Sequence, residues 1–140
     1  MSRREEFLAG DRPDDVAIYL SEDSVDDIGK LTKYGEEVED GIVLTIPGES
    51  GRSAFSKVAG KDAMAFAKEA MDEEGEISAD LTGGSCPACG ATDDLDYVFA
   101  FAEERNEEVG GLYAEGDVIH AYARCGCSAA FSDRWVAGER

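Results

Sequence analysis

The sequence predicts an α+β fold, in which a small N-terminal α/β layer precedes an antiparallel three-stranded sheet. Residues 1–81 alternate apolar runs of strand length with patterns of helical spacing. A Gly-rich stretch at 82–85 ends this alternation, and beyond it the hydrophobic period changes to two, which is typical of strands that bury one face. We therefore expect two domains, an acidic α/β domain at 1–81 and a second domain at 84–140.

The first domain is expected to begin with a short helix at 2–9 and to contain two buried strands. Residues 16–20 and 42–46 are apolar runs bounded by acidic or turn residues. Because βα crossovers are right-handed, the two strands would be parallel if they are neighbours. The dipeptide Asp40-Gly41 predicts a hairpin that pairs Val38 with the second strand.

Two longer helices are expected in the same domain. Apolar residues at helical spacing predict one helix that starts at Ser24 and ends at Gly35, with acidic residues in its first turn. A second helical pattern covers 50–74, and Gly60 should break or kink it.

The second domain is expected to be a set of antiparallel strands. Apolar and aromatic residues alternate over 97–102 and 118–123, and a last strand at 129–136 carries Phe131 and Trp135. The Gly-Gly pair at 110–111 supplies a turn between the first two strands.

The charge is the most unusual property of the composition. The chain has 32 Asp and Glu against 13 Lys and Arg, for a formal net charge of −19. In molar salt the Debye length is about 3 Å, so these charges barely repel one another and keep the surface hydrated. We expect a folded halophilic protein rather than a disordered acidic one, because Val, Ile, Leu, Phe and Tyr recur throughout the chain. The charge also disfavours non-specific binding of nucleic acid, because such binding depends on neutralising phosphates.

The longest apolar runs have strand length, and the first residues lack the apolar stretch of a signal peptide. We therefore expect a cytoplasmic protein that does not enter a membrane. In a reduced compartment, two close pairs of cysteines indicate a metal site rather than disulfides.

The cysteines form the strongest motif of the sequence. Cys86-Pro87-Ala88-Cys89-Gly90 places two thiols at the tip of a tight turn, and Gly90 permits the positive backbone angle that ends it. The second pair, Cys125 and Cys127, follows an antiparallel hairpin that returns the chain towards the first pair. Four thiolates can then surround one tetrahedral ion.

This arrangement of knuckle, hairpin and second knuckle resembles the zinc ribbon superfamily over residues 84–136. The resemblance implies a zinc ion bound by Cys86, Cys89, Cys125 and Cys127. The second pair departs from the pattern, since it is Cys-x-Cys rather than Cys-x-x-Cys, and His120, the only histidine, is an alternative ligand. Four thiolates leave no open coordination position, so the zinc is expected to be structural.

Cys86-Pro87-Ala88-Cys89 also looks like the redox pair of thioredoxin-type proteins, but there the motif opens a helix, whereas here a strand is expected after it. The whole chain resembles the small conserved haloarchaeal families of unassigned function, which implies a salt-rich archaeal cytoplasm and no known activity.

We expect a non-enzymatic module that binds a protein partner, through an aromatic patch of Tyr113, Tyr122 and Trp135. Two alternatives remain open. One is a ligand-binding, anion-binding or enzymatic α/β domain that uses the loop from Gly48 to Lys57, where Arg52 and a helix N-terminus would attract an anion. The other is a zinc ribbon associated with nucleic acid.

Overall fold

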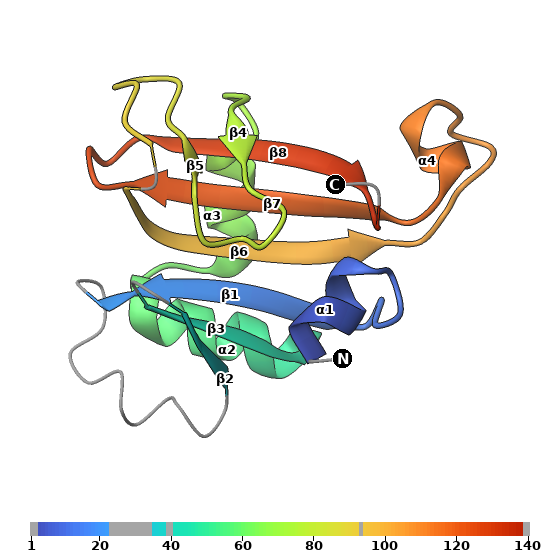
Figure 1. The fold of residues 1–140 in the computed structure, drawn as a ribbon, viewed down its shortest axis with the longest axis horizontal. Helices are drawn as coiled ribbons and strands as arrows, with labels where there is room; N and C mark the ends of the chain where they lie inside the picture. Colours follow the sequence, from blue (N-terminus) through green and yellow to red (C-terminus); the bar gives the residue numbers. More distant parts are fainter. Residues whose placement is uncertain (1–2, 23–34, 39–40, 93, 139–140) are drawn as a thin grey trace.

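The structure, a computed structural model, describes residues 3–22, 35–38, 41–92 and 94–138. A six-stranded sheet of order β2-β3-β1-β6-β7-β8 forms its centre (Figure 1), and every neighbouring pair is antiparallel. The strands are β1 Asp15–Ser21, β2 Gly35–Val38, β3 Gly41–Pro47, β6 Leu95–Glu103, β7 Val118–Cys125 and β8 Ala130–Val136. The remaining elements are α1 Arg3–Leu8, α2 Gly48–Ala59, α3 Ala63–Ala70, α4 Leu112–Glu115 and a small sheet of β4 Glu76–Ile77 with β5 Gly84–Ser85.

The predicted α+β class is confirmed, but the expectation of a separate three-stranded ribbon is wrong. The strands β6, β7 and β8 form one half of the six-stranded sheet, because β6 pairs with β1 from Val16 opposite Phe101 to Leu20 opposite Tyr97. All seven residues of β1 are buried. Such a strand needs a hydrogen-bonded neighbour at each edge, which β3 and β6 provide, and an apolar layer over each face of the sheet. The segments 1–81 and 84–140 therefore share one sheet.

The expected parallel pairing of the first two apolar strands is also wrong. These strands, β1 and β3, are neighbours and antiparallel, with Ile18 opposite Leu44. The reason is the hairpin of β2 with β3, predicted from Asp40-Gly41, in which Val38 lies opposite Gly41. The chain crosses from β1 to β2, which runs in the same direction, and the hairpin then brings β3 between them. Of the helix predicted from Ser24 to Gly35, all but Gly35, the first residue of β2, lies outside the described residues.

Two apolar layers cover the two faces of the sheet. Helices α2 and α3 lie on one face (Figure 1), where Phe55 of α2 and Phe66 of α3 pack on Tyr97 and Phe99 of β6 at ring distances of 5.1–5.3 Å. As predicted, the helical segment breaks at Gly60, which is left-handed with a φ of 74°. Asp62 then caps α3 by accepting a hydrogen bond from the Ala65 N–H.

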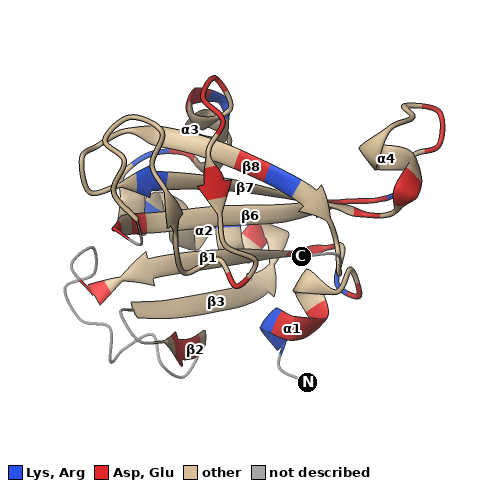
Figure 2. Ribbon diagram, turned by 45° about the horizontal axis from the view of Figure 1, so that its top comes forward, with Lys and Arg blue, Asp and Glu red and all other residues tan. Residues whose placement is uncertain are grey.

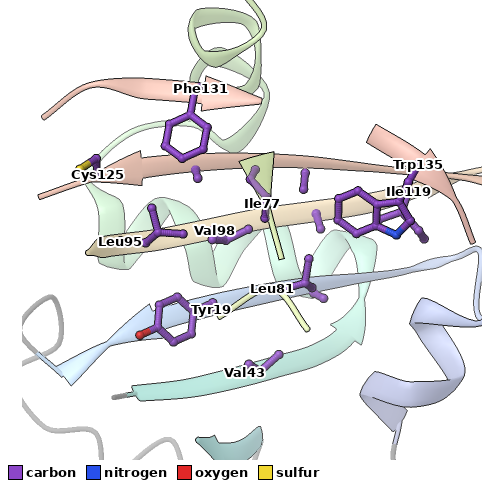
Figure 3. Close-up of a cluster of buried hydrophobic side chains, with 14 of the residues drawn as sticks. Tyr19, Val43, Ile77, Leu81, Leu95, Val98, Ile119, Cys125, Phe131 and Trp135 are labelled. Carbon is purple, nitrogen blue, oxygen red and sulfur yellow. The ribbon is translucent and has the colours of Figure 1, made fainter. Parts of the chain in front are cut away.

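In the described part of the chain, no long helix lies on the opposite face. This face is covered by α1 through Phe7, and by the segment containing β4 and β5 through Ile77 and Leu81 (Figure 3). These side chains reach the sheet because β1, β6 and β7 present small residues on this face: Ala17, Ala100, Ala121 and Ala123. None of the described helices has the length and apolarity needed to cross a membrane.

The packing of α2 on β1 yields a test of this arrangement. Gly51 is buried in α2, and a Cβ at this position would overlap the Cγ2 methyl of Val16. We expect Gly51→Leu to lower the free energy of unfolding by about 1–3 kcal/mol, because the helix must move away from the sheet. Ser53→Ala on the exposed side of α2 is the matched control and should change stability by less than about 0.5 kcal/mol. Equal stabilities of the two variants in urea unfolding would contradict this packing.

The charge distribution yields a second test. Acidic residues recur over α4 and the loops, with few basic residues among them (Figure 2). We expect the melting temperature to rise steeply from dilute buffer to molar potassium chloride, because salt screens the repulsion within a chain of net charge −19. Replacing surface Asp and Glu by Asn and Gln should flatten this dependence. A melting temperature that does not change with salt would contradict the halophilic interpretation.

Candidate metal centre

The first cysteine pair lies in a tight turn immediately after β5. The Cys86 N–H donates to the Ala91 carbonyl at 2.9 Å, and the Gly90 N–H donates to the Cys86 carbonyl at 3.0 Å. Gly90 is left-handed, with a φ of 75°, as its position after the motif predicts. The turn therefore directs the side chains of Cys86 and Cys89 to the same side.

The second pair lies in the turn between β7 and β8. The Cys125 N–H donates to the Ala129 carbonyl at 2.9 Å, and the Ser128 N–H donates to the Cys125 carbonyl at 2.8 Å. Ser128 adopts a φ of 79°, which lets the chain reverse within this short loop. The Gly126 N–H donates to the Asp94 carbonyl at 2.8 Å and thereby joins this turn to the residues that precede β6.

The two turns bring together the four cysteines that were predicted as metal ligands. All four Sγ atoms of Cys86, Cys89, Cys125 and Cys127 lie within 4.8 Å of one another. Two of the separations are 3.7 Å, from Cys86 to Cys127, and 3.6 Å, from Cys89 to Cys125. Four sulfurs at the usual Zn–S bond length of 2.3 Å from a tetrahedral ion are about 3.8 Å apart. The cluster can therefore hold a metal ion, and the Cys-x-Cys spacing does not prevent it.

The site is buried on one side only. Cys86 and Cys125 are buried, whereas Cys89 and Cys127 are exposed. Burial disfavours the Cys86 thiolate, but hydrogen bonds from the backbone N–H groups of Cys89 and Ala88 outweigh it and lower the pKa of Cys86 to about 7. At Cys125 burial dominates and raises the pKa to about 12. A bound cation would stabilise the thiolate form at both positions, since a coordinating thiol loses its proton.

His120 is not part of this cluster. It lies five positions before Cys125 on β7, which places it about 17 Å away along the strand. Its Nε2 forms a hydrogen bond with the Glu103 carboxylate at 2.9 Å, and its ring is stacked between Phe101 and Tyr113. The structure therefore assigns His120 to the packing of the sheet face, away from the four sulfurs.

The aromatic residues expected to form one patch lie on opposite faces of the sheet. Tyr113 and Tyr122 line a cavity on the face that carries α3. Trp135 is only 6% exposed and packs into the apolar layer of the other face. Strand alternation explains the separation, because Trp135 lies opposite Ile119 on the neighbouring strand, whereas Tyr122 lies opposite Ser132.

The loop from Gly48 to Lys57 forms the first turns of α2 rather than a free loop. Arg52 lines a cavity there, together with the carboxylates of Asp14, Asp15 and Glu49. Asp15 pairs with Arg3 at 2.9 Å, but the cavity lining still has three acidic residues against one arginine, which makes it unfavourable for an anion. These acids could not be associated with the loop from local sequence, because Asp14 and Asp15 come from a distant part of the chain.

Comparison with known proteins gives one match. The family described as "Family of unknown function (DUF5807)" matches residues 35–138, which include all four cysteines. No curated protein and no solved structure matches the chain.

Proposed function

The chain belongs to this family of unknown function, and we propose from its geometry that it is a small, halophilic, zinc-binding protein that acts as a non-catalytic protein-interaction module. The observation that carries the proposal is the cluster of four Sγ atoms within 4.8 Å of one another. A set of four sulfur ligands in tetrahedral array is typical of structural zinc, or of iron.

A structural role follows from the number and position of the ligands. Four thiolates fill the tetrahedral positions of zinc, so no site is left for a water molecule or a substrate. The ligands come from two turns that are far apart in sequence, one after β5 and the other between β7 and β8. Zinc would fix the turn at 86–90 to the end of β7 and thereby hold the segment before β6 against the sheet.

The proposal of a protein partner rests on α3. Met64 and Met71 are 49% and 60% exposed, and both belong to the few large apolar side chains on the described surface. They are seven residues apart, so they lie on one side of the helix. Exposed methionines suit adaptable protein contacts, and burial of apolar surface is not screened by salt. A nucleic-acid partner is less consistent with the net charge of −19.

The metal proposal is tested by elemental analysis of freshly purified, reduced protein. We expect one zinc per chain, and loss of most of it in Cys89→Ser, because three thiolates bind the ion more weakly than four. The same variant should unfold at lower temperature. Ala88→Ser, at the exposed tip of the same turn, is the matched control and should keep both metal and stability. Reduced protein without metal, or full occupancy in Cys89→Ser, would contradict the site.

The interaction proposal is tested separately by affinity capture in molar potassium chloride, followed by mass spectrometry. A specific partner should be retained by the native chain and by Arg52→Ala, but lost from a double variant with Met64→Glu and Met71→Glu. Retention by the double variant, or loss on Arg52→Ala alone, would show that α3 is not the binding surface.

A further inference from the structure

The cavity beside α3 contains an arginine that is held in place by aromatic rings. The guanidinium of Arg134 lies 6.0 Å from the centre of the Tyr113 ring and donates to the Tyr113 hydroxyl at 3.5 Å. Tyr113 stacks on His120 at 5.9 Å, and His120 stacks on Phe101 at 5.1 Å. This row of rings, which starts on β6 and ends on α4, fixes the position of the guanidinium at the cavity wall.

The cavity has a volume of about 390 Å³, which is large enough for a small organic molecule. It is bounded by the end of α3, by α4 and by the sheet. Its lining includes Met71, Glu74, Tyr113, Tyr122, Ser132 and Arg134. The lining thus combines an apolar side, formed by the Tyr122 ring and the Met71 side chain, with a cationic side formed by Arg134.

Arg134 is unusual in this acidic chain because it has no carboxylate partner among the described residues. The arginines at positions 3, 4, 12, 105 and 124 all form ion pairs with Asp or Glu. Only Arg52 and Arg134, of the arginines that the structure describes, form none. Most N–H donors of Arg134 are therefore available to a ligand in the cavity.

The acids that line the same cavity limit the charge of the ligand. Asp133 already accepts hydrogen bonds from the Ile77 N–H at 3.1 Å and from the Arg134 N–H at 2.8 Å. Glu74 is exposed and also lines the cavity. Repulsion from these two carboxylates disfavours a dianion such as a phosphate monoester, whereas a single carboxylate matches the planar guanidinium.

We propose that this cavity binds a carboxylate that is attached to an aromatic group, either in a small acid or at the C-terminal residue of a protein. The carboxylate pairs with Arg134, and the aromatic group lies between Tyr122 and Met71. No cysteine lines the cavity, so this site is independent of the metal and goes beyond the proposed function.

The test is calorimetric titration of the full chain, carrying its metal, in molar potassium chloride. The probes are 3-phenylpropionate, N-acetylphenylalanine, the amide of N-acetylphenylalanine and acetate. We expect the two aromatic acids to bind, and the amide and acetate to bind at least about tenfold more weakly, because each lacks one half of the recognised group. A peptide with a C-terminal phenylalanine that binds more tightly than both free acids identifies a protein terminus as the source, and equal binding identifies a small acid. Failure of both aromatic acids to bind overturns the proposal.

Variants of the two unpaired arginines identify the site. Arg134→Gln should weaken binding of the aromatic acids by about tenfold or more, and Arg134→Lys should have an intermediate effect, because it keeps the charge without the planar fork. Arg52→Gln, the matched control on the other side of α3, should bind as the native chain does. Met71→Ala should weaken 3-phenylpropionate but leave acetate unchanged, and circular dichroism checks that each variant is folded. Native affinity in Arg134→Gln, or equal losses in Arg134→Gln and Arg52→Gln, would overturn the assignment to this cavity.

Discussion

The pairing of β1 with β6 is the contact on which the rest of the structure depends. β1 is buried on both faces, as is β6 from Tyr97 to Ala100, with Ile18 opposite Phe99 on one face and Ala17 opposite Ala100 on the other. A strand with two apolar faces loses its stabilisation unless both faces are covered, so the chain must supply two layers. One layer is α2 with α3. The other consists of α1 and the segment that leads into the first cysteine pair.

The candidate metal centre is a continuation of the second layer. Cys86 and Cys125 belong to the same apolar cluster as Ile77, Leu81 and Phe131 (Figure 3). Segment 73–77 is joined to β8 by hydrogen bonds between the Ser132 N–H and the Glu73 carbonyl and between the Gly75 N–H and the Ser132 carbonyl, both at 2.9 Å. The four sulfurs therefore converge because the sheet positions both turns, and not because of a ribbon that folds by itself.

Local features of the fold could be predicted from the sequence, and non-local ones could not. The apolar runs at 16–20 and 42–46 identify β1 and β3 almost to the residue, and the hairpin before Gly41 and the break at Gly60 depend on a few adjacent residues. The convergence of the four cysteines was predictable because each pair fixes its own turn and the alternating patterns at 97–102 and 118–123 predict the hairpin of β6 and β7 that returns the second turn to the first. The β1 and β6 pairing was not, since it joins segments about 80 residues apart and no local pattern encodes which edges meet. For the same reason Trp135 was wrongly predicted to form one patch with Tyr122, and the cavity at Arg134 was not predicted.

The unequal cover of the two faces explains why a small chain would need a metal. On one face, α2 and α3 bury large side chains such as Phe55 and Phe66. On the other, the covering segment from 76 to 92 contains only two strands of two residues each, and the sheet beneath it presents alanines. Among the described residues from 82 to 92, Cys86 is the one buried apolar side chain, so the loss of conformational entropy in this part of the segment is poorly offset. Structural zinc contributes about 10–16 kcal/mol in small zinc-binding peptides, which is comparable to the whole stability of about 5–15 kcal/mol of a typical domain. A single ion bound by the four cysteines would therefore suffice to hold this segment against the sheet. On the opposite face, apolar packing holds α2 and α3.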